Sequence, residues 1–335
     1  MKKIQRFLII TLIFILGISL GGCKKNVGTP EDNPVKEESE DETQTEEKEQ
    51  TVIGFSVIDM ANPFYKALEN SIKEEADRAG DTFISKDSKG DANIQAANIA
   101  EMIQEGINVL VLTPVDNEAI TESLKALKEA KVKVINVDSK VKETKYVEAF
   151  IGSDNDKAGE LLAEETMKRF PNGGKVAILE SQAQNSVVSR ITSYESGLTK
   201  AEKGFEVVER KDAGGDQESA KAAALEMLAN HGDIDVFICG NDEMAFGVQS
   251  AVNEKNVTGI KIFSIDGSPT IKAELLNPES SITATVAQAP ITMGKTTFSV
   301  LESIVEGKEF ESESTEPVYL VTEENVDVYG TDGWK

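Results

Sequence analysis

From about residue 51 onward, short apolar runs alternate with amphipathic stretches of helical period, and glycines stand where the helices should end. Val52 to Ile58 predicts a strand, Pro63 to Ala79 predicts a helix, and Thr82 to Ser85 predicts the next strand. The same alternation predicts further strands near residues 109–112, 133–137, 147–151, 176–179, 205–208, 236–239, 261–265 and 282–286. We therefore predict an α/β fold built on parallel sheets.

The N-terminus has a different pattern. Three basic residues within the first six positions precede an apolar stretch over residues 7–20, which leads into Gly21-Gly22-Cys23. The stretch is too short for a spanning helix and predicts a signal peptide over residues 1–22. The motif Leu20-Gly21-Gly22-Cys23 resembles bacterial lipoprotein signals, which implies that Cys23 is acylated and anchors the chain on the extracytoplasmic face of the cell membrane. The alternative is a plain signal peptide with a cysteine there by chance.

Charge separates a tether from the folded body. Residues 23–50 are strongly acidic and lack aromatic side chains, which predicts a disordered tether after the lipidated cysteine. The whole chain has 35 Lys and Arg against 59 Asp and Glu, a formal net charge of -24. Because phosphate binding requires a basic face, we expect no nucleic-acid partner.

Few residues are suited to catalysis. The chain has two cysteines, and if Cys23 is acylated then Cys239, in an apolar run, has no disulfide partner and is predicted to be a buried structural thiol. The only histidine, His231, is predicted to follow a helix C-terminus. Partial matches to a P-loop at 293–297 and to a calcium loop at 154–165 lack required residues, and no dinucleotide motif follows a strand. We therefore expect no enzyme activity, no cofactor and no metal site.

Polar and aromatic side chains follow several of the predicted strands. Ligands of open α/β sheets bind at the carboxyl ends of strands. The side chains at these positions are Asp59, Asn62, Phe64, Tyr65, Asp138, Asn241, Asp242, Asp266 and Gln288. Carboxylates accept hydrogen bonds from neighbouring hydroxyls, amides both donate and accept, and a ring covers the apolar face of a sugar. The set predicts a site for a neutral polyol or sugar.

Each of these residues has a structural alternative. Asn62-Pro63 can begin a helix while Phe64 and Tyr65 pack on the core, and this is compatible with ligand contact. We predict Asp242 to be the N-cap of the following helix. Asp138 could cap a helix and Asp266 could form a turn, but a charge at the end of an apolar strand is costly unless paired or solvated, so we favour the site for both.

Four motifs stand in the order found in one known family. They are Asn62-Pro63-Phe64-Tyr65, Asn241-Asp242-Glu243-Met244-Ala245, Ile265-Asp266-Gly267 and Thr285-Val286-Ala287-Gln288. The chain from 51 to about 325 thereby resembles the ribose/galactose-type periplasmic sugar-binding proteins, the substrate-binding components of ABC importers. The resemblance implies the type I fold, two Rossmann-like lobes joined by a three-stranded hinge, with crossings near 152–153, 288 and 310–314. The implied N-terminal lobe is 51–152 plus 288–312, and the C-terminal lobe is 153–287 plus 313–335.

The resemblance also implies a set of ligand contacts. Carried onto this chain they are Asn62, Phe64, Tyr65, Asp138, Arg190, Asn241, Asp266 and Gln288. Arg190 follows the galactose-type pattern, and a surface position on its helix is the alternative. The chain departs from the ribose binders at Ser139 and Tyr194, where they have arginines, at Gly215, where they have an aromatic residue, and at Ile58, where they have a hydroxyl. Ribose itself is therefore not the expected ligand, and if Arg190 does not reach the site, the acidic pocket favours an amino-bearing ligand.

The expected function follows from the anchor and the site together. We predict a monomeric, membrane-anchored receptor that closes on a monosaccharide-like ligand by hinge bending and delivers it to an ABC permease. The alternative keeps the same binding but presents the closed form to a membrane sensor or signalling protein. Sugar-responsive transcription regulators share the implied fold, but the lipid-attachment motif and the missing helix-turn-helix segment argue against them.

Overall fold

The computed structural model describes residues 50–201 and 204–334. The predicted signal peptide, Cys23 and nearly all of the predicted tether lie outside these residues. Within them, no helix combines the length and the apolar character that crossing a membrane requires.

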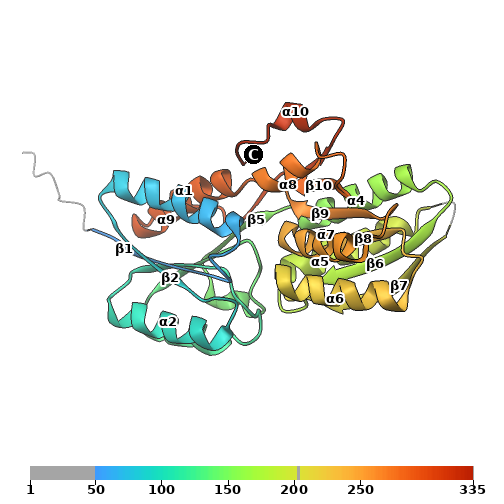
Figure 1. Cartoon of the computed structure of the whole chain (residues 1–335). Helices are drawn as coiled ribbons and strands as arrows, with labels where there is room; N and C mark the ends of the chain where they lie inside the picture. The colour runs from blue at the N-terminus through green and yellow to red at the C-terminus, as the bar shows by residue number, and fades with distance from the viewer. Residues whose placement is uncertain (1–49, 202–203, 335) are drawn as a thin grey trace, which may run out of the picture. The chain divides into compact units, whose positions relative to one another are not determined.

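The first sheet has six strands, all parallel, in the order β11-β5-β4-β3-β1-β2 (Figure 1). Its strands are β1 (Val52–Val57), β2 (Thr82–Asp87), β3 (Val109–Leu112), β4 (Lys133–Val137), β5 (Ala149–Ser153) and β11 (Glu313–Glu316). The helices of this lobe are α1 (Pro63–Ala79), α2 (Ala92–Gln104), α3 (Thr121–Glu129), η1 (Thr144–Tyr146) and α9 (Pro290–Val305). One apolar cluster joins α1 and α9 to the sheet, and a second joins α2 and α3 to its other face.

The second sheet repeats this plan in the order β12-β10-β9-β8-β6-β7, with β12 antiparallel to β10 and the other pairs parallel. Its strands are β6 (Gly174–Glu180), β7 (Phe205–Asp212), β8 (Val236–Cys239), β9 (Lys261–Asp266), β10 (Ile282–Ala287) and β12 (Tyr319–Thr322). Its helices are α4 (Asn155–Arg169), α5 (Asn185–Leu198), α6 (Gln217–Asn230), α7 (Asp242–Lys255), α8 (Pro269–Glu274) and α10 (Val326–Tyr329). The predicted α/β fold with two lobes is confirmed.

The two residues considered for catalysis are structural. Cys239 ends β8 and is fully buried in the core of the second lobe, and this burial raises the pKa of its thiol well above the ordinary range. His231 is the C-cap of α6, as predicted, and its Nε2 lies 3.2 Å from Glu209 Oε2. Neither side chain is placed for nucleophilic chemistry.

The chain passes between the two sheets after β5, after β10 and between β11 and β12. β11 pairs with β5 over Glu313–Glu316, so these residues belong to the first sheet. β11 reads Glu-Ser-Thr-Glu and is an edge strand with no buried residue, so no apolar run marks it in the sequence.

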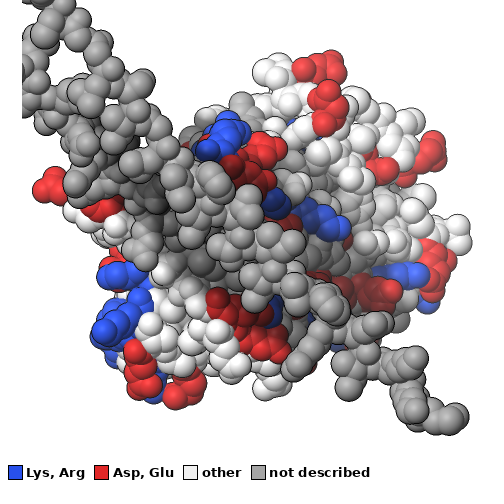
Figure 2. Space-filling view, turned by 90° about the vertical axis from the view of Figure 1, so that its left-hand side faces the viewer, with Lys and Arg blue, Asp and Glu red and all other residues white. Residues whose placement is uncertain are grey.

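The acidic surface also carries bases. On the face shown in Figure 2, Lys and Arg side chains lie in small groups among Asp and Glu. Among the described residues, ion pairs near the surface include Lys86 with Glu101 and Glu105 at 2.7 and 2.9 Å. Ion pairs of this kind contribute little stability because water screens them.

Candidate ligand-binding site

A small cavity lies where the carboxyl ends of strands from both sheets meet. Ten residues line it, and they include all eight candidates from the sequence: Asn62, Phe64, Tyr65, Asp138, Gln184, Ser186, Arg190, Asn241, Asp266 and Gln288. The lining is mostly polar, and its two rings come from the first lobe.

The aromatic wall is set by the start of α1. Asn62 is the N-cap, its Oδ1 accepts from the backbone N–H of Phe64 at 2.8 Å, and Pro63 occupies the first turn. This cap directs the next two side chains inward, where the rings of Phe64 and Tyr65 pack edge to face with centroids 5.4 Å apart. Both rings belong to the core cluster of the first lobe and also line the cavity. Core packing and a position in the site, the two interpretations offered by the sequence, are therefore compatible.

The two strand-end aspartates have unusual backbone conformations. Asp138 follows β4 with φ at 61°, and Asp266 ends β9 with φ at 150°. Residues other than glycine avoid this region, and such strain persists only where the surrounding structure enforces it. Asp138 precedes no helix that it could cap, and its Oδ2 accepts from the Tyr65 hydroxyl at 3.0 Å. The strained backbone at Asp138 and Asp266 supports a ligand role for their carboxylates.

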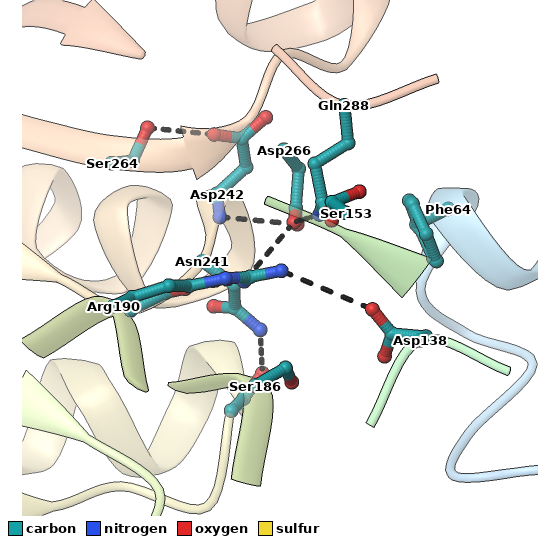
Figure 3. Close-up of polar contacts among 12 residues, drawn as sticks. Phe64, Asp138, Ser153, Ser186, Arg190, Asn241, Asp242, Ser264, Asp266 and Gln288 are labelled. Atoms are coloured by element: carbon teal, nitrogen blue, oxygen red, sulfur yellow. Dashed lines mark hydrogen bonds and ion pairs between the residues drawn. The ribbon is translucent and has the colours of Figure 1, made fainter. Parts of the chain in front are cut away.

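Arg190 projects from α5 into the space between the two aspartates (Figure 3). Its Nη2 lies 3.9 Å from Asp138 Oδ1, and its Nη1 lies 3.6 Å from Asp266 Oδ1. The guanidinium is held by Asn155 Oδ1, which accepts from Nε at 2.7 Å, and by the Gly240 carbonyl, which accepts from Nη1 at 2.8 Å. With only 3% of its surface exposed, Arg190 is not a surface residue, and the surface alternative is wrong.

Gln288 connects the third motif to the fourth. Its Nε2 donates to Asp266 Oδ1 at 2.7 Å. Its Oε1 is buried and has no hydrogen-bond partner in the described part of the chain, although buried polar atoms are almost always paired. Gln288 lines the cavity, so a donor on a ligand would satisfy this oxygen.

The prediction that Asp242 caps α7 is wrong. Asn241 is the N-cap, and its Oδ1 accepts from the backbone N–H of Met244 at 2.9 Å. Asp242 occupies the first turn, and its buried carboxylate accepts from Ser264 Oγ at 2.6 Å, from Thr285 Oγ1 at 2.9 Å and from the Ser268 N–H at 2.8 Å. Because these donors all belong to the second lobe, Asp242 ties α7 to β9 and β10 beside the cavity.

Burial and charge act together on the acids of the site. Burial raises the pKa of Asp138, and the guanidinium of Arg190 opposes this rise. The pKa of Asp266 is raised well above the ordinary carboxyl range, first by burial and then by the charge of Asp242. Burial and the neighbouring Asp138 likewise raise the pKa of Tyr65, so its hydroxyl stays a donor. The cavity therefore combines buried acceptors with one guanidinium, an arrangement suited to a ligand with several hydroxyl groups.

The four departures from the ribose-type pattern lie at different distances from the cavity. Tyr194 is buried and its hydroxyl donates to Thr166 Oγ1 at 3.3 Å, so it takes no part in the lining. Ile58 and Gly215 border a neighbouring cavity, which shares lining residues with the first, namely Asn62, Tyr65, Gln184 and Asn241. Ser139 lies at the contact between the lobes, where its Oγ accepts from the Ser186 N–H at 3.3 Å.

Two lining residues, Gln184 and Ser186, were not predicted from the sequence. Gln184 lies in the polar segment that follows β6, and Ser186 lies in the first turn of α5, so the rule of strand-end residues, applied after β6, would have pointed to both. The same segment joins the lobes, because Asn185 Nδ2 donates to the Lys140 carbonyl at 2.7 Å and Asn117 Nδ2 donates to the Ala183 carbonyl at 2.9 Å. The described arrangement therefore has the lobes in direct contact around the cavity.

No group of three or more His, Cys, Asp or Glu side chains is arranged to hold a metal ion within residues 50–201 and 204–334. The acidic residues of the cavity are instead engaged with Tyr65, Gln288 and Arg190. Its chemistry is that of hydrogen bonding and ring contact.

Comparison with known proteins gives a consistent result along the chain. A family profile described as a periplasmic binding protein domain matches residues 53–309. The ribose import binding protein of Bacillus subtilis (strain 168) is 29% identical over 276 residues, which cover 82% of this chain and 88% of that protein. The fructose import binding protein of Bifidobacterium longum is 28% identical over 271 residues, 78% of this chain and 81% of that protein.

Solved structures resemble this one over nearly their whole length. An ABC transporter solute binding protein from Bacillus halodurans with bound myo-inositol has a TM-score of 0.77 at 25% identity, covering 85% of this chain and 99% of that one. Another from Mycobacterium smegmatis with bound glycerol has a TM-score of 0.78 at 27% identity, covering 83% and 96%. These matches span the segments that carry the resemblance seen in the sequence, and they confirm it.

Proposed function

Because this chain belongs to the family of periplasmic binding protein domains, we propose that it captures a monosaccharide-like ligand between its two lobes and delivers it to an ABC importer. The observation that carries the proposal is the cavity itself, to which both lobes contribute. It contains two carboxylates with strained backbones, a buried guanidinium and two aromatic rings. The relatives are transport binding proteins and not enzymes, which confirms the prediction that this chain is not an enzyme.

The ligand chemistry follows from the hydrogen-bonding groups. Asp138, Asp266 and the free Oε1 of Gln288 accept hydrogen bonds, and Arg190 supplies the donor side. A polyol presents many hydroxyl groups that both donate and accept, and its apolar face suits the ring of Phe64. Since Arg190 reaches both aspartates, a neutral sugar or cyclic polyol is favoured over an amino-bearing ligand. The relatives that bind ribose, fructose, myo-inositol and glycerol support this class.

Hinge bending would couple capture to recognition. Ligand atoms can contact Asp138 and Asp266 together only when the lobes meet, so binding shifts the population toward the closed form. The hydrogen bonds of Asn185 to Lys140 and of Asn117 to Ala183 belong to that form. A permease that recognises the closed form would then distinguish loaded from empty receptor. A membrane sensor could recognise the same form, and cross-linking in the native membrane would separate the two partners.

The location of the receptor is proposed from its N-terminus. We propose cleavage before Cys23, lipid attachment to that residue, and an acidic tether that holds a monomeric body outside the membrane. Intact mass measured on the chain from its native host gives a direct check. A mature N-terminus at Cys23 carrying lipid is expected, and Cys23→Ala should release the body from the membrane fraction. A mature chain without lipid would leave a plain secreted receptor.

A thermal-shift screen tests the binding proposal. The full-length chain in detergent would be heated with D-ribose, D-allose, D-fructose, myo-inositol, glycerol or D-glucosamine, because a ligand that binds only the native state raises Tm by mass action. We expect at least one neutral sugar or cyclic polyol to raise Tm and to lose this effect in Asp266→Ala. A response to D-glucosamine alone would contradict the neutral-ligand assignment. If no compound shifts Tm, capture of a monosaccharide-like ligand is not supported.

A further inference from the structure

The last residues of the chain turn back toward the cavity. After α10, Gly330 has φ at 71°, a backbone conformation that favours glycine. The C-terminal end then lies between α9 of the first lobe and α8 of the second (Figure 1). There the ring of Trp334, the only tryptophan in the sequence, packs edge to face on Phe64 with centroids 5.9 Å apart.

This segment is fastened to the second lobe. Val326 of α10 is buried in the core of that lobe, and Tyr329 packs against the same cluster. Farther along, the Gly333 carbonyl accepts a hydrogen bond at 2.6 Å from Nζ of Lys272, a fully buried residue of α8. Trp334 follows directly and joins the apolar cluster of the first lobe. One side of the tail is therefore held by the second lobe, and its last ring lies on the first.

The contact continues into the proposed ligand site. Phe64 lines the cavity and is itself in edge-to-face contact with Tyr65, whose hydroxyl donates to Asp138. The three rings thus form a series that begins outside the cavity and ends at one of its strained carboxylates. Phe64 has only 2% of its surface exposed, and Trp334, which does not line the cavity, is one of the side chains that cover it. Removal of the indole would leave the Phe64 ring free to change rotamer.

We propose that Trp334 is a positioning residue for the ligand, which holds the Phe64 ring in place from the second lobe. The aromatic wall of the site is then assembled by both lobes, although its rings belong to the first. This inference rests on the proposed function, because it gives the wall a ligand to face. It also makes Trp334 an internal reporter, since its fluorescence responds to the placement of Phe64.

The first experiment needs no ligand. Acrylamide quenching of Trp334 would be compared in the full-length chain and in Phe64→Ala, with Val328→Ala as the matched control, because Val328 is 82% exposed on α10. We expect Phe64→Ala to increase quenching and to shift the emission to longer wavelength, while Val328→Ala matches the wild type. Unchanged quenching in Phe64→Ala would overturn the contact and the proposal with it.

The second experiment uses the six compounds of the thermal-shift screen as probes in calorimetric titrations. For a probe that binds the wild type, Trp334→Ala should raise Kd roughly three- to tenfold, the scale of one aromatic edge contact, and Trp334→Phe should recover most of the affinity. Wild-type Kd in Trp334→Ala, with or without a lower Tm, would reduce Trp334 to a structural residue and overturn the proposal. If no probe binds the wild type, the proposed function fails, and the quenching comparison still decides whether Trp334 rests on Phe64.

Discussion

Arg190 and Asp138 meet across the two lobes, with Nη2 of the arginine 3.9 Å from Oδ1 of the aspartate. Arg190 belongs to α5 of the second lobe, and Asp138 follows β4 of the first. Both side chains are buried, so the pair forms only when the lobes exclude water from the space between them. A buried pair adds little net stability because desolvation offsets the attraction, but a charge left without its partner is costly. Closure of the two lobes therefore depends on charge as well as on shape.

Arg190→Met should abolish ligand binding. The change removes the guanidinium between Asp138 and Asp266 and leaves both buried carboxylates without a cationic partner. Breaking a buried ion pair in this way destabilises a folded arrangement by on the order of 3–5 kcal/mol. Arg190→Lys is the matched variant, because it keeps the charge and loses the planar fork, and intermediate affinity is expected. Calorimetric titration with a sugar that binds the wild type measures both. Equal affinity in Arg190→Met and the wild type would remove Arg190 from the site.

Asp266→Asn should change how the stability of the ligand-free protein depends on pH. The folded-state pKa of Asp266 is raised by burial and by the charge of Asp242, whereas in the unfolded chain it is about 3.9. Between these two values the folded state holds a proton that the unfolded state has lost, so this contribution to stability is present at low pH and disappears as pH rises through the folded pKa.

Urea unfolding from pH 4 to pH 7 tests this dependence. The free energy of unfolding of Asp266→Asn, relative to the wild type, should increase as pH rises. The same variant should bind ligand poorly. The carboxylate of Asp266 accepts hydrogen bonds at both of its oxygens, whereas an amide has a single acceptor oxygen. A difference that is constant over this pH range would contradict the raised pKa.

Phe64→Ala should weaken ligand binding by about 1–3 kcal/mol through lost ring contact and apolar burial. Phe64 also belongs to the core of the first lobe, so a lower Tm is expected as well. Phe298→Ala provides the comparison, because Phe298 is buried in the same cluster and does not line the cavity. It should lower Tm and leave Kd unchanged. If both variants bind equally well, Phe64 belongs to the core alone.

Asn185→Ala should raise Kd although Asn185 does not line the cavity. Its Nδ2 donates across the lobes to the Lys140 carbonyl, and one such hydrogen bond contributes roughly 0.5–1.5 kcal/mol to the closed form. A two- to tenfold rise in Kd is the corresponding expectation. Asn277→Ala is the control, since its amide donates to Glu274 within the second lobe. Identical affinities in the two variants would show that this hydrogen bond does not favour closure.

Gly159→Ala should destabilise the second lobe and misplace Arg190. A Cβ at this position of α4 would lie 2.2 Å from the Arg190 carbonyl and 2.7 Å from the Tyr194 amide nitrogen, both in α5. Backbone atoms cannot move aside as a side chain can, and overpacking typically costs about 1–3 kcal/mol. Gly232→Ala is the control, because no atom lies within 4 Å of the added methyl. Thermal unfolding should separate the two by several degrees, and equal Tm values would contradict the close packing.

Much of the site could be predicted because its residues follow a positional rule. Parallel strands end at one edge of each sheet, so residues after apolar runs, such as Asp138 and Asp266, meet in space although they are far apart in sequence. The start of α1 at Asn62-Pro63 can also be predicted from the local sequence, because an N-cap residue followed by a proline is a typical helix start.

The features that were not predicted depend on tertiary contacts. Asn241 and Asp242 are both acceptable N-caps in sequence, and only the hydroxyls of Ser264 and Thr285 decide which carboxyl or amide oxygen turns inward. Strand β11 is polar and short, so its pairing with β5 leaves no period in the sequence. Along the sequence, Trp334 lies well beyond the last strand, and no local motif indicates that its ring contacts Phe64.

The third crossing has a consequence for the order in which the molecule can be completed. The first lobe receives its edge strand β11 only when residues 313–316 have been made, and the second lobe receives β12 only with residues 319–322. Domains usually fold one after another as the chain emerges. Here the half that is synthesised first cannot finish first, and both halves become complete within a few residues of each other. A growing chain of this kind therefore keeps both sheets incomplete until residues 313–322 have been made.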